Sequence, residues 1–313
     1  MKKRVVVFGS FVTDLTSRSG GLPLPGQTLI GSSFKSGPGG KGSNQAVAAF
    51  RAGADVKLVT KLGDDIFGKA ALDFYKKEGM DTDYILTDSE KETGAALIMV
   101  DEQSAQNEIV VIPGACGNIT ADDVEKARPL IESAELLLLQ LEINFDALQR
   151  VVDIAHDAGV TVVLNPAPAA VLPDEILRKV DIIAPNETEA QTLTGVSIKN
   201  GQDAQNAAAV FMSKGIKQVV ITLGYMGAFA TDGQRSEIVP RIAVDAVDTT
   251  GAGDAFLGGF LTALSEGCDL FGALRFGNAT GALSVTKRGT APAMPHRAQI
   301  DELMKKTYGN DIS

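Results

Sequence analysis

One short stretch in the last third of the sequence places an acidic side chain beside glycines at the start of an apolar run. The stretch is VDTTGAGDAFLGGF, residues 247–260, in which Asp254 directly follows Gly251, Ala252 and Gly253. The apolar spacing after Asp254 predicts a helix, and the glycines free backbone N–H groups to point outward at its N-terminus. Such groups, with the positive end of the helix dipole, bind anions. Asp254 could act as a base beside a bound anion or could cap the helix, and the sequence alone leaves both roles open.

A second glycine-rich stretch surrounds a lysine. Residues 36–53 read SGPGGKGSNQAVAAFRAG, with Lys41 among glycines and Asn44 leading into a predicted helix. Glycine lets a backbone approach a ligand closely and adopt positive φ angles. The stretch is not the GxxxxGK[ST] phosphate loop, because Lys41 is followed by Gly42. We therefore expect a ligand-binding loop of another kind rather than a flexible turn.

A pair of polar residues follows a predicted strand in the stretch DIIAPNETEAQTLTG, where Asn186 and Glu189 open a helix. Residues three apart lie on one helix face. Their oxygens could hold Mg2+ directly or through water, since this ion prefers oxygen ligands. The same pair also fits a capping box, in which each side chain bonds to the backbone N–H of the other residue. Both interpretations stay open at this point.

The glycines do not form a dinucleotide-binding fingerprint. A GxGxxG pattern starting at Gly251 would need a small residue at Phe256, and it would normally follow the first strand of the fold. The first predicted strand and the residues after it, VVVFGSFVTD, contain no such pattern. A nicotinamide-dependent oxidoreductase is therefore disfavoured.

The elements that must position these residues alternate along the chain. Short apolar runs at residues 5–8, 56–60, 136–139, 161–164, 182–184 and 219–222 predict strands, and 242–247 is also strand-like. Amphipathic stretches at 67–78, 145–158 and 204–213 predict helices. This alternation predicts an α/β fold with a central, mostly parallel sheet flanked by helices on both faces. The carboxyl ends of parallel strands share one edge, where ligands bind, and this edge should gather Asp14, Lys41, Glu142, Asn186, Gly224 and Asp254.

Two stretches break this alternation. Residues 95–100 and 108–112 predict a β-hairpin, and residues 13–36 are rich in Gly, Ser and Pro without a helical period. We expect these stretches to build a small separate sheet. A sheet of so few strands is marginal alone, so its apolar face should cover a ligand cleft, a second subunit, or both.

Composition limits the classes of partner. The chain has 313 residues and a formal net charge of −10, which argues against a nucleic-acid partner held by phosphate contacts. It contains no apolar run of about 18 residues, so no membrane span is expected. Its only cysteines, Cys116 and Cys268, form no CxxC pair, which favours a reducing, cytoplasmic setting.

The whole chain resembles the ribokinase family, within the phosphofructokinase-B type of carbohydrate kinases. The segment PGGKGSNQAVAAFRAGADVKLVTKLGDDIFG is similar to the family's N-terminal signature, and VDTTGAGDAFLGGFL is similar to its C-terminal signature. The motifs LNPAPA, PNETEA and VITLGYMG fall between them in the expected order. The resemblance implies one ribokinase-like α/β kinase domain over residues 1–313, with a β-sheet lid inserted from about residues 13–36 and 94–112.

The implied reaction is transfer of the γ-phosphoryl group of ATP to the primary hydroxyl of a pentose, with D-ribose giving D-ribose 5-phosphate as the first expectation. A kinase for 2-deoxyribose or another sugar or nucleoside is the alternative, and a non-catalytic sugar or nucleotide sensor is a remote one. The family also implies Mg2+, activation by a monovalent cation such as K+, and a homodimer formed through the lid sheet.

The resemblance also implies roles for individual residues. It makes Asp254 the base and Gly251, Ala252 and Gly253 the anion hole. The sugar would contact Asp14, Gly40, Lys41, Asn44, Glu142 and Asp254. The ATP site would consist of Asn186, Thr222, Leu223, Gly224, Tyr225, Met226, Gly227, Gly253 and Asn278. Glu189 would act on Mg2+ through water, and the monovalent-cation site would consist of Asp248, Thr250, Ser284, Lys287 and Gly289.

Two positions depart from the family pattern. Val12 stands where the family usually has an asparagine that touches sugar hydroxyls, and Ala293 stands where many members have a serine near the cation. Loss of a polar contact to a buried hydroxyl costs on the order of 1–3 kcal/mol. Val12 therefore makes a deoxy or otherwise altered sugar an alternative acceptor, and Ala293 predicts a weaker dependence on the cation.

Overall fold

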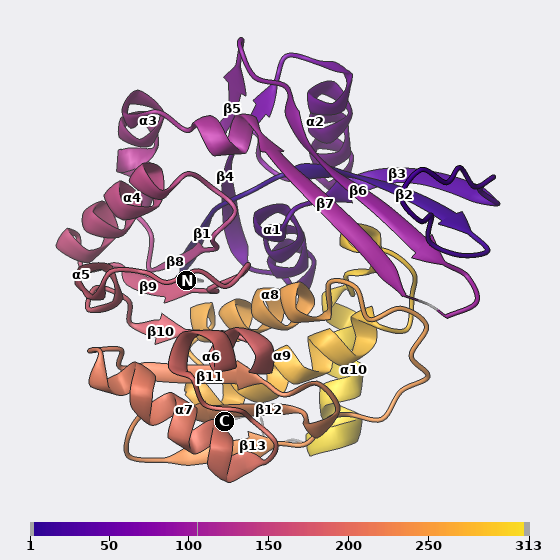
Figure 1. Cartoon of the computed structure of the whole chain (residues 1–313). Helices are drawn as coiled ribbons and strands as arrows, with labels where there is room; N and C mark the ends of the chain where they lie inside the picture. The colour runs from indigo at the N-terminus through magenta and orange to yellow at the C-terminus, as the bar shows by residue number, and fades with distance from the viewer. Residues whose placement is uncertain (1–2, 105, 310–313) are drawn as a thin grey trace.

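The computed structural model describes residues 3–104 and 106–309, which form two β-sheets and the helices around them (Figure 1). The larger sheet has the strand order β13-β12-β11-β10-β9-β8-β1-β4-β5. Neighbouring strands from β5 to β11 are parallel, and β12 and β13 continue the sheet antiparallel at one edge. The strands are β1 (Arg4–Phe8), β4 (Asp55–Gly63), β5 (Ile85–Asp88), β8 (Leu136–Leu139), β9 (Thr161–Leu164), β10 (Ile182–Ile183), β11 (Gln218–Thr222), β12 (Ala228–Thr231) and β13 (Ser236–Val239). The predicted mostly parallel α/β sheet is confirmed.

Helices cover both faces of this sheet because its strands are apolar on both sides. In β1, Val5 and Val7 belong to one hydrophobic core cluster, whereas Val6 and Phe8 belong to the other. Alternate residues of a strand point to opposite faces, so a continuous apolar run is buried only between two layers. The first face is covered by α1 (Lys41–Ala52), α2 (Ile66–Glu78), α8 (Ala252–Ser265), α9 (Leu270–Ser284) and α10 (Arg297–Tyr308). The second is covered by α3 (Ala121–Glu132), α4 (Phe145–Asp157), α5 (Asp174–Leu177), α6 (Glu187–Thr194) and α7 (Gly201–Ser213).

Two local predictions are wrong. Residues 242–247 form no strand, although their sequence is strand-like, because they lie beyond the edge strand β13 and have no ladder partner. Their end is held instead by the backbone of Val247, whose N–H donates to Val285 O at 2.7 Å. Helix α1 begins at Lys41 rather than after Asn44, because Gly40 at the cap position adopts a φ of 88° and turns the chain into the helix.

The smaller sheet has the order β3-β2-β6-β7 and projects from one side of the body (Figure 1). Its strands are β2 (Val12–Ser19), β3 (Ser33–Gly39), β6 (Thr93–Asp101) and β7 (Asn107–Gly114). The predicted hairpin is the antiparallel pair β6–β7, while β2 runs parallel to β6. Ladder partners share a face of a sheet, so Leu15, Leu97 and Val110 lie together on the face opposite to Asp14. Leu97 is 48% exposed and Val110 is 58% exposed, so this outer face carries uncovered apolar side chains.

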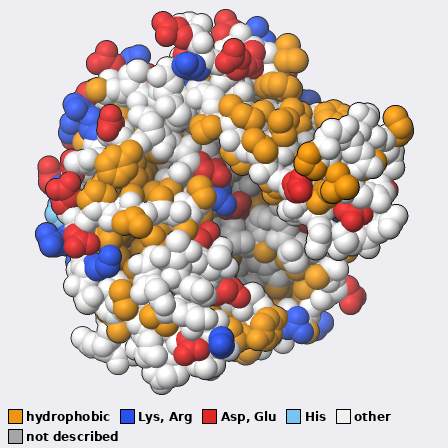
Figure 2. Space-filling view, viewed as in Figure 1, with side chains coloured by type: hydrophobic (Ala, Val, Ile, Leu, Met, Phe, Trp, Pro, Cys, Tyr) orange, Lys and Arg blue, Asp and Glu red, His pale blue; other side chains and the backbone are white. Residues whose placement is uncertain are grey.

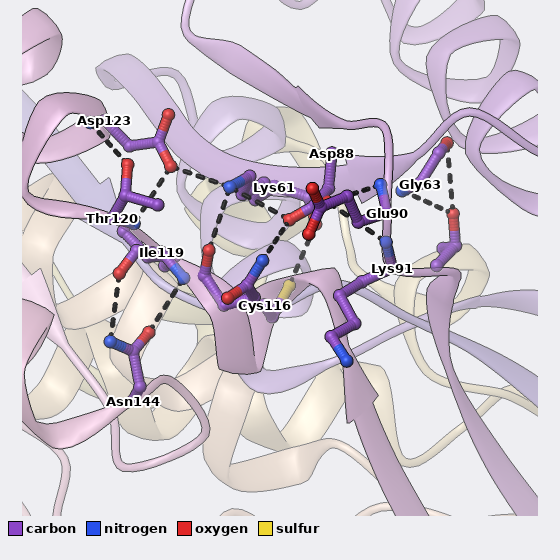
Figure 3. Close-up of polar contacts among 12 residues, drawn as sticks. Lys61, Gly63, Asp88, Glu90, Lys91, Cys116, Ile119, Thr120, Asp123 and Asn144 are labelled. Carbon is purple, nitrogen blue, oxygen red and sulfur yellow. Dashed lines mark hydrogen bonds and ion pairs between the residues drawn. The ribbon is translucent and has the colours of Figure 1, made fainter.

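A buried ion cluster lies where β6 and β7 of the smaller sheet join the body (Figure 3). Lys61, at 5% exposure, lies 2.7 Å from Asp123 Oδ2 and 3.0 Å from Asp88 Oδ2, and it donates to Asn118 O at 2.8 Å. Asp88 Oδ1 accepts the backbone N–H groups of Glu90 and Lys91, just before β6. Burial favours the neutral acid at Asp88, but these donors outweigh it and lower the pKa of Asp88. The cluster therefore fixes the connections that lead into β6 and out of β7.

Candidate active site

The first turn of α8 borders open space. The residue at its cap position is Gly251, with a φ of 77° and no side-chain cap, and Asp254 lies inside the turn. Gly253 is exposed, and a Cβ atom added there would meet nothing within 4 Å. Asp254 therefore does not cap the helix. Of the two roles that the sequence left open, the cap is excluded by this geometry, and the role of a base beside a bound anion stays a prediction.

Two amide side chains of α1 hold the Asp254 carboxylate. Asn44 Nδ2 donates to Oδ2 at 2.9 Å, and Gln45 Nε2 donates to Oδ1 at 2.8 Å. The two helices pack so closely that a Cβ atom on Gly258 would lie 2.4 Å from Ala48 Cβ. Burial raises the pKa of Asp254, while Lys41 and the two amides oppose the rise by stabilising the carboxylate. The result is a buried, hydrogen-bonded acid at the mouth of the helix.

Three of the amides around this acid were not singled out from the sequence. Gln45 also donates to Asn165 Oδ1 at 3.0 Å, and Gln140 Nε2 donates to Gln45 Oε1 at 2.6 Å. Gln45 and Gln140 are 0% exposed, and Asn165 is 7% exposed. A glutamine in the middle of an otherwise small and apolar helix face was the available signal, because uncharged polar side chains are seldom buried without a partner.

A second acid faces the start of α1. Glu142, which follows β8, accepts the backbone N–H of Lys41 at 3.0 Å and the hydroxyl of Ser10. Burial lowers the pKa of the Lys41 ammonium, but the carboxylates of Asp254, Glu142 and Glu189 outweigh burial, and the net shift is upward. Lys41 is therefore a firmly charged cation among carboxylates from separate elements of the fold.

A third acid enters the site from the smaller sheet. Asp14 of β2 accepts the Thr290 hydroxyl at 3.1 Å, and its carboxylate lies where a Cβ atom on Gly39 would be, 2.2 Å from Oδ1. Burial raises the pKa of Asp14 to about 6, and the charges of Asp254 and Glu142 add to the rise. Asp14, Lys41, Glu142 and Asp254, which the sequence predicted to gather at one edge, thus lie within electrostatic reach of one another.

The pair at the start of α6 forms the capping box. Asn186 N–H donates to Glu189 Oε2 at 2.9 Å, and Glu189 N–H donates to Asn186 Oδ1 at 2.8 Å. Glu189 also lies within electrostatic reach of the site. Burial raises its pKa, the backbone N–H of Asn186 and the charge of Lys41 oppose the rise, and Asp254 adds to it, so the net shift is upward. Among residues 3–104 and 106–309, no group of three His, Cys, Asp or Glu side chains is placed to hold a metal ion. The capping interpretation is correct, and a role on Mg2+ through water stays a prediction.

The predicted nucleotide residues lie in the turn after β11 and on α9. Asn186 pairs with Thr222 as an isolated bridge, and Gly224 adopts a φ of 52° in the turn η2 (Gly224–Met226). Tyr225 is 73% exposed, whereas the Leu223 side chain is fully buried, so Leu223 offers a ligand only its backbone. A Cβ atom at position 227 would lie 2.0 Å from Val239 O, which explains the glycine there. On α9, the side-chain nitrogen Asn278 Nδ2 donates to Pro240 O at 2.9 Å.

The predicted monovalent-cation residues come together in two adjoining segments. Asp248 accepts the N–H of Thr250 at 3.0 Å and the N–H of Gly289 at 3.1 Å. Burial raises the pKa of Asp248, but these donors outweigh burial and the net shift is downward. Ser284 O already accepts the N–H of Lys287 at 3.3 Å, and the Lys287 side chain is exposed.

The two residues that depart from the family pattern are both buried. Val12 is 4% exposed and pairs with Gly39 where β2 leaves the body. Ala293 is 1% exposed in the short helical turn η3 (Ala291–Ala293). Neither side chain is therefore at the solvent-exposed surface of the protein.

The surface is hollowed between the main body and the smaller sheet (Figure 2), and acidic and basic side chains face into the hollow. Apolar side chains gather at the surface of the projecting part of the molecule in the same view. In the described ranges, no helix is long and apolar enough to span a membrane. The site is therefore an open, strongly charged cleft beside the first turn of a helix.

The sequence and structure match known carbohydrate kinases over nearly their full length. The family model described as pfkB family carbohydrate kinase matches residues 2–297. The ribokinase of Haemophilus influenzae is 43% identical over 305 residues, which cover 97% of this chain and 99% of that protein. The deoxyribokinase of Salmonella typhi is 34% identical over 301 residues, which cover 96% of this chain and 98% of that protein.

A solved structure repeats the match in three dimensions. The structure of Arabidopsis thaliana ribokinase complexed with ribose and ATP has a TM-score of 0.89 and 32% identity, and it covers 97% of this chain and 99% of that one. The architecture, the charged cleft and these full-length matches agree. The chain belongs to the pfkB family of carbohydrate kinases, and within it to the ribokinase-like sugar kinases.

Proposed function

We propose that the protein transfers the γ-phosphoryl group of ATP to the primary hydroxyl of D-ribose, giving D-ribose 5-phosphate and ADP. The observation that carries this proposal is the position of Asp254, buried and hydrogen-bonded beside the open first turn of α8. The similarity to a ribokinase at 43% identity supports ribose as the acceptor.

In the proposed reaction, Asp254 accepts the proton of the primary hydroxyl as the hydroxyl oxygen attacks the γ-phosphorus. A new O–P bond forms, the bond between the γ-phosphorus and its bridging oxygen breaks, and ADP leaves with that electron pair. The N–H groups at Gly251 and Gly253 stabilise the charge on the transferring group, and that of Ala252, which donates to Thr249 O at 3.2 Å, would join them on leaving that bond. Phosphoryl transfer relies on such positioning and charge stabilisation more than on covalent chemistry.

The remaining site residues divide between the two substrates. Asp14, Gly40, Lys41, Asn44 and Glu142 line the sugar side, where carboxylates can accept hydroxyl protons and Lys41 can donate. The nucleotide lies over the turn after β11, with backbone contacts from Leu223 and Gly224 and side-chain contacts from Asn186, Thr222, Tyr225, Met226, Gly227 and Asn278.

A kinase for 2-deoxyribose is the second candidate, because buried, apolar Val12 stands where the family usually has an asparagine that touches sugar hydroxyls. A site without a partner for a given hydroxyl discriminates weakly against the sugar that lacks it. ADP release with ribose, 2-deoxyribose, fructose and nucleosides, each with and without K+, distinguishes the two candidates. A kcat/KM for 2-deoxyribose above that for ribose would overturn ribose as the acceptor.

Two ions fit the proposed reaction differently. No three-ligand protein cluster is described for Mg2+, so Glu189 would hold the ion through water while phosphate oxygens bind it directly. Bound Mg2+ neutralises phosphate charge. K+ would lie by Asp248, whose depressed pKa keeps a carboxylate there, with Thr250, Ser284, Lys287 and Gly289 contributing backbone oxygens.

A homodimer would cover the outer face of the smaller sheet. Leu97 and Val110 lie together on this face and are 48% and 58% exposed, and exposed apolar patches mark interaction sites. Leu97→Glu should convert a dimer to a monomer in light scattering. Ile66→Glu, at a site that is 76% exposed at the start of α2, is the control and should leave the mass unchanged.

Replacement of the proposed base tests the reaction itself. Asp254→Asn keeps the shape of the side chain but cannot accept the proton, so ADP production should fall by about 10²–10⁴-fold while ATP still binds. The measurement is a coupled ADP-release assay together with calorimetric titration of ATP. Turnover equal to that of the wild type would refute the role of Asp254.

A further inference from the structure

We propose that Gln45 is a positioning residue for phosphoryl transfer: its side-chain amide fixes the orientation of the Asp254 carboxylate, and Gln140 and Asn165 fix that amide in turn. The inference rests on the proposed function, since it takes Asp254 as the base. It concerns a side chain that does not itself contact the reacting atoms and acts only through Asp254.

The amide of Gln45 can face Asp254 in only one way. Its Nε2 is placed between two acceptors, Asp254 Oδ1 at 2.8 Å and Asn165 Oδ1 at 3.0 Å, and its Oε1 accepts Gln140 Nε2 at 2.6 Å. A half-turn of the amide would put an oxygen against the carboxylate and an NH2 group against Gln140 Nε2. Because the amide has two N–H donors and both are used, its orientation is fixed by polarity as well as by shape.

The partners of Gln45 are anchored to the ends of neighbouring strands. Gln140 follows β8, Asn165 follows β9, and Asn165 Nδ2 donates to Ala184 O, just after β10, at 2.9 Å. These three strands are adjacent in the larger sheet. Gln140, Gln45 and Asn165 therefore form a connected row of amides over the carboxyl ends of these strands, and Asp254 is bonded to Gln45, the middle member of the row.

Burial strengthens the hydrogen bonds of the row and makes their loss costly. Gln45 and Gln140 are 0% exposed, so water does not compete for their hydrogen bonds. Hydrogen bonds are electrostatically stronger in such surroundings, and a broken row leaves costly unpaired groups. Gln140 Oε1 has no described partner, so Gln140 is bonded to the row only through its Nε2, which donates to Gln45.

The row matters for the charge of the base. Four charged groups face Asp254: Lys41 on α1 favours the carboxylate, whereas Glu142 after β8, Asp14 on β2 and Glu189 on α6 disfavour it. Burial also favours the neutral acid. The N–H donors of Asn44 and Gln45 oppose these effects by binding the charged form. Removing the Gln45 donor should therefore leave a larger fraction of Asp254 protonated and unable to act as a base.

The test replaces Gln45 with Met, which has a similar volume and no donor. In the full chain, the acid limb of the kcat–pH profile should move upward by roughly one pH unit, because the carboxylate loses a donor. At pH values on the acid limb, kcat should fall by up to about tenfold, while the KM for ATP stays unchanged. Gln45→Glu keeps the shape but places a second carboxyl beside Asp254, so its acid limb should move further upward.

A matched control removes a hydrogen bond between the same two helices without touching Asp254. Thr262 Oγ1 donates to Gly258 O at 2.8 Å and lies 3.3 Å from Ala49 O of α1. Thr262→Val should lower the melting temperature but leave the kcat–pH profile as in the wild type. A shift of the profile in this control equal to that of Gln45→Met would overturn the inference, since general loosening would then explain both.

Gln140→Met provides an independent test of the inference if Gln45→Met does not fold. It releases the Oε1 side of Gln45 but keeps the donor to Asp254, so a smaller upward shift of the acid limb is expected. Where both fold, their effects on kcat should be less than additive, because they act through one row. A wild-type profile in the folded variants, with Asp254→Asn inactive, overturns only the role of Gln45. A wild type that releases no ADP overturns the proposed function as well.

Discussion

The hydroxyl of Thr290 lies 3.1 Å from Asp14 Oδ2 and 3.1 Å from Pro38 O. Asp14 belongs to β2 and Pro38 to β3, so one side chain of the loop after α9 contacts two neighbouring strands of the smaller sheet. The preceding residue, Gly289, donates its N–H to Asp248 at 3.1 Å. One short loop thus joins Asp14, the proposed acid on the sugar side, to the segment that leads into α8.

Thr290→Val should weaken sugar binding at mildly acid pH. Burial raises the pKa of Asp14 to about 6, and the Thr290 hydroxyl opposes this rise. Without the hydroxyl the pKa rises further, so fewer Asp14 side chains are ionised and able to accept sugar hydroxyls. We expect the KM for the pentose to rise about three- to tenfold near pH 6.5 and less near pH 8, with kcat nearly unchanged. Thr290→Ser keeps the hydroxyl and is the control; an equal rise in both variants would argue against the hydrogen bond.

Asp14→Asn should stabilise the folded protein at neutral and alkaline pH. The pKa of Asp14 is about 6 in the folded chain against 3.8 for an ordinary aspartate, so the folded state holds the proton more tightly. The cost of ionising Asp14 in the fold is absent below about pH 4 and is fully present above about pH 6. Its removal should raise the free energy of unfolding by on the order of 1–3 kcal/mol near pH 8 and by much less near pH 4.5.

Urea unfolding at these two pH values measures that difference. Asp73→Asn, at an exposed position of α2, is the control and should change the free energy of unfolding by less than about 0.5 kcal/mol. The same gain for Asp14→Asn at both pH values would contradict the raised pKa. The substituted protein should also bind the pentose poorly, because an amide replaces the charged acceptor.

Lys61→Met should destabilise the protein strongly without entering the active site. It leaves Asp88 and Asp123, whose side chains are 4% and 10% exposed, without their buried cation. Breaking a buried ion pair from one side typically costs about 3–5 kcal/mol. Urea unfolding should show this loss at neutral pH. Lys69→Met removes a pair whose side chains are 71% and 70% exposed, and it should cost about 1 kcal/mol or less. Equal losses in the two variants would show that burial of the Lys61 cluster is unimportant.

Gly253→Ala should separate activity from stability. The φ of Gly253 lies outside the left-handed region and its Cβ position is open, so alanine fits without strain. Alanine is favoured over glycine in a helix by up to about 1 kcal/mol, so the melting temperature should hold or rise. The methyl group would project into the space assigned to the transferring phosphoryl group, and kcat should fall at least about tenfold. Gly21→Ala also fills open space, in the β2–β3 loop, and should keep full activity.

Local patterns predicted β1, β4, β8, β9, β10 and β11 of the larger sheet, because each is a short apolar run whose side chains are mostly buried. They missed β5, β12 and β13, of which β5 and β13 carry partly exposed side chains. They failed at residues 242–247, since a strand also needs a neighbour with free ladder positions, and no residue in that segment reports whether one exists. The sequence also could not choose between a cap and a base for Asp254. That choice depends on the φ of Gly251 and on the side chains that reach the carboxylate.

The amides around Asp254 could not be predicted from local sequence. Gln45 and Asp254 are 209 residues apart, and Gln45 and Gln140 are 95 residues apart. Their contacts exist only when α1, α8 and the end of β8 are packed together. By contrast, Asn186 and Glu189 are three residues apart, so their capping box was a local prediction.

The parallel pairing of β2 with β6 decides how the smaller sheet is attached. Val12 pairs with Gly39, Thr13 with Ala95, and Thr93 with Gly114. All four strands of the smaller sheet therefore join the body at the same end, along one line. A rotation of the whole smaller sheet about that line would keep its own ladder hydrogen bonds intact, so the proposed kinase would open and close its sugar site without breaking any strand pairing.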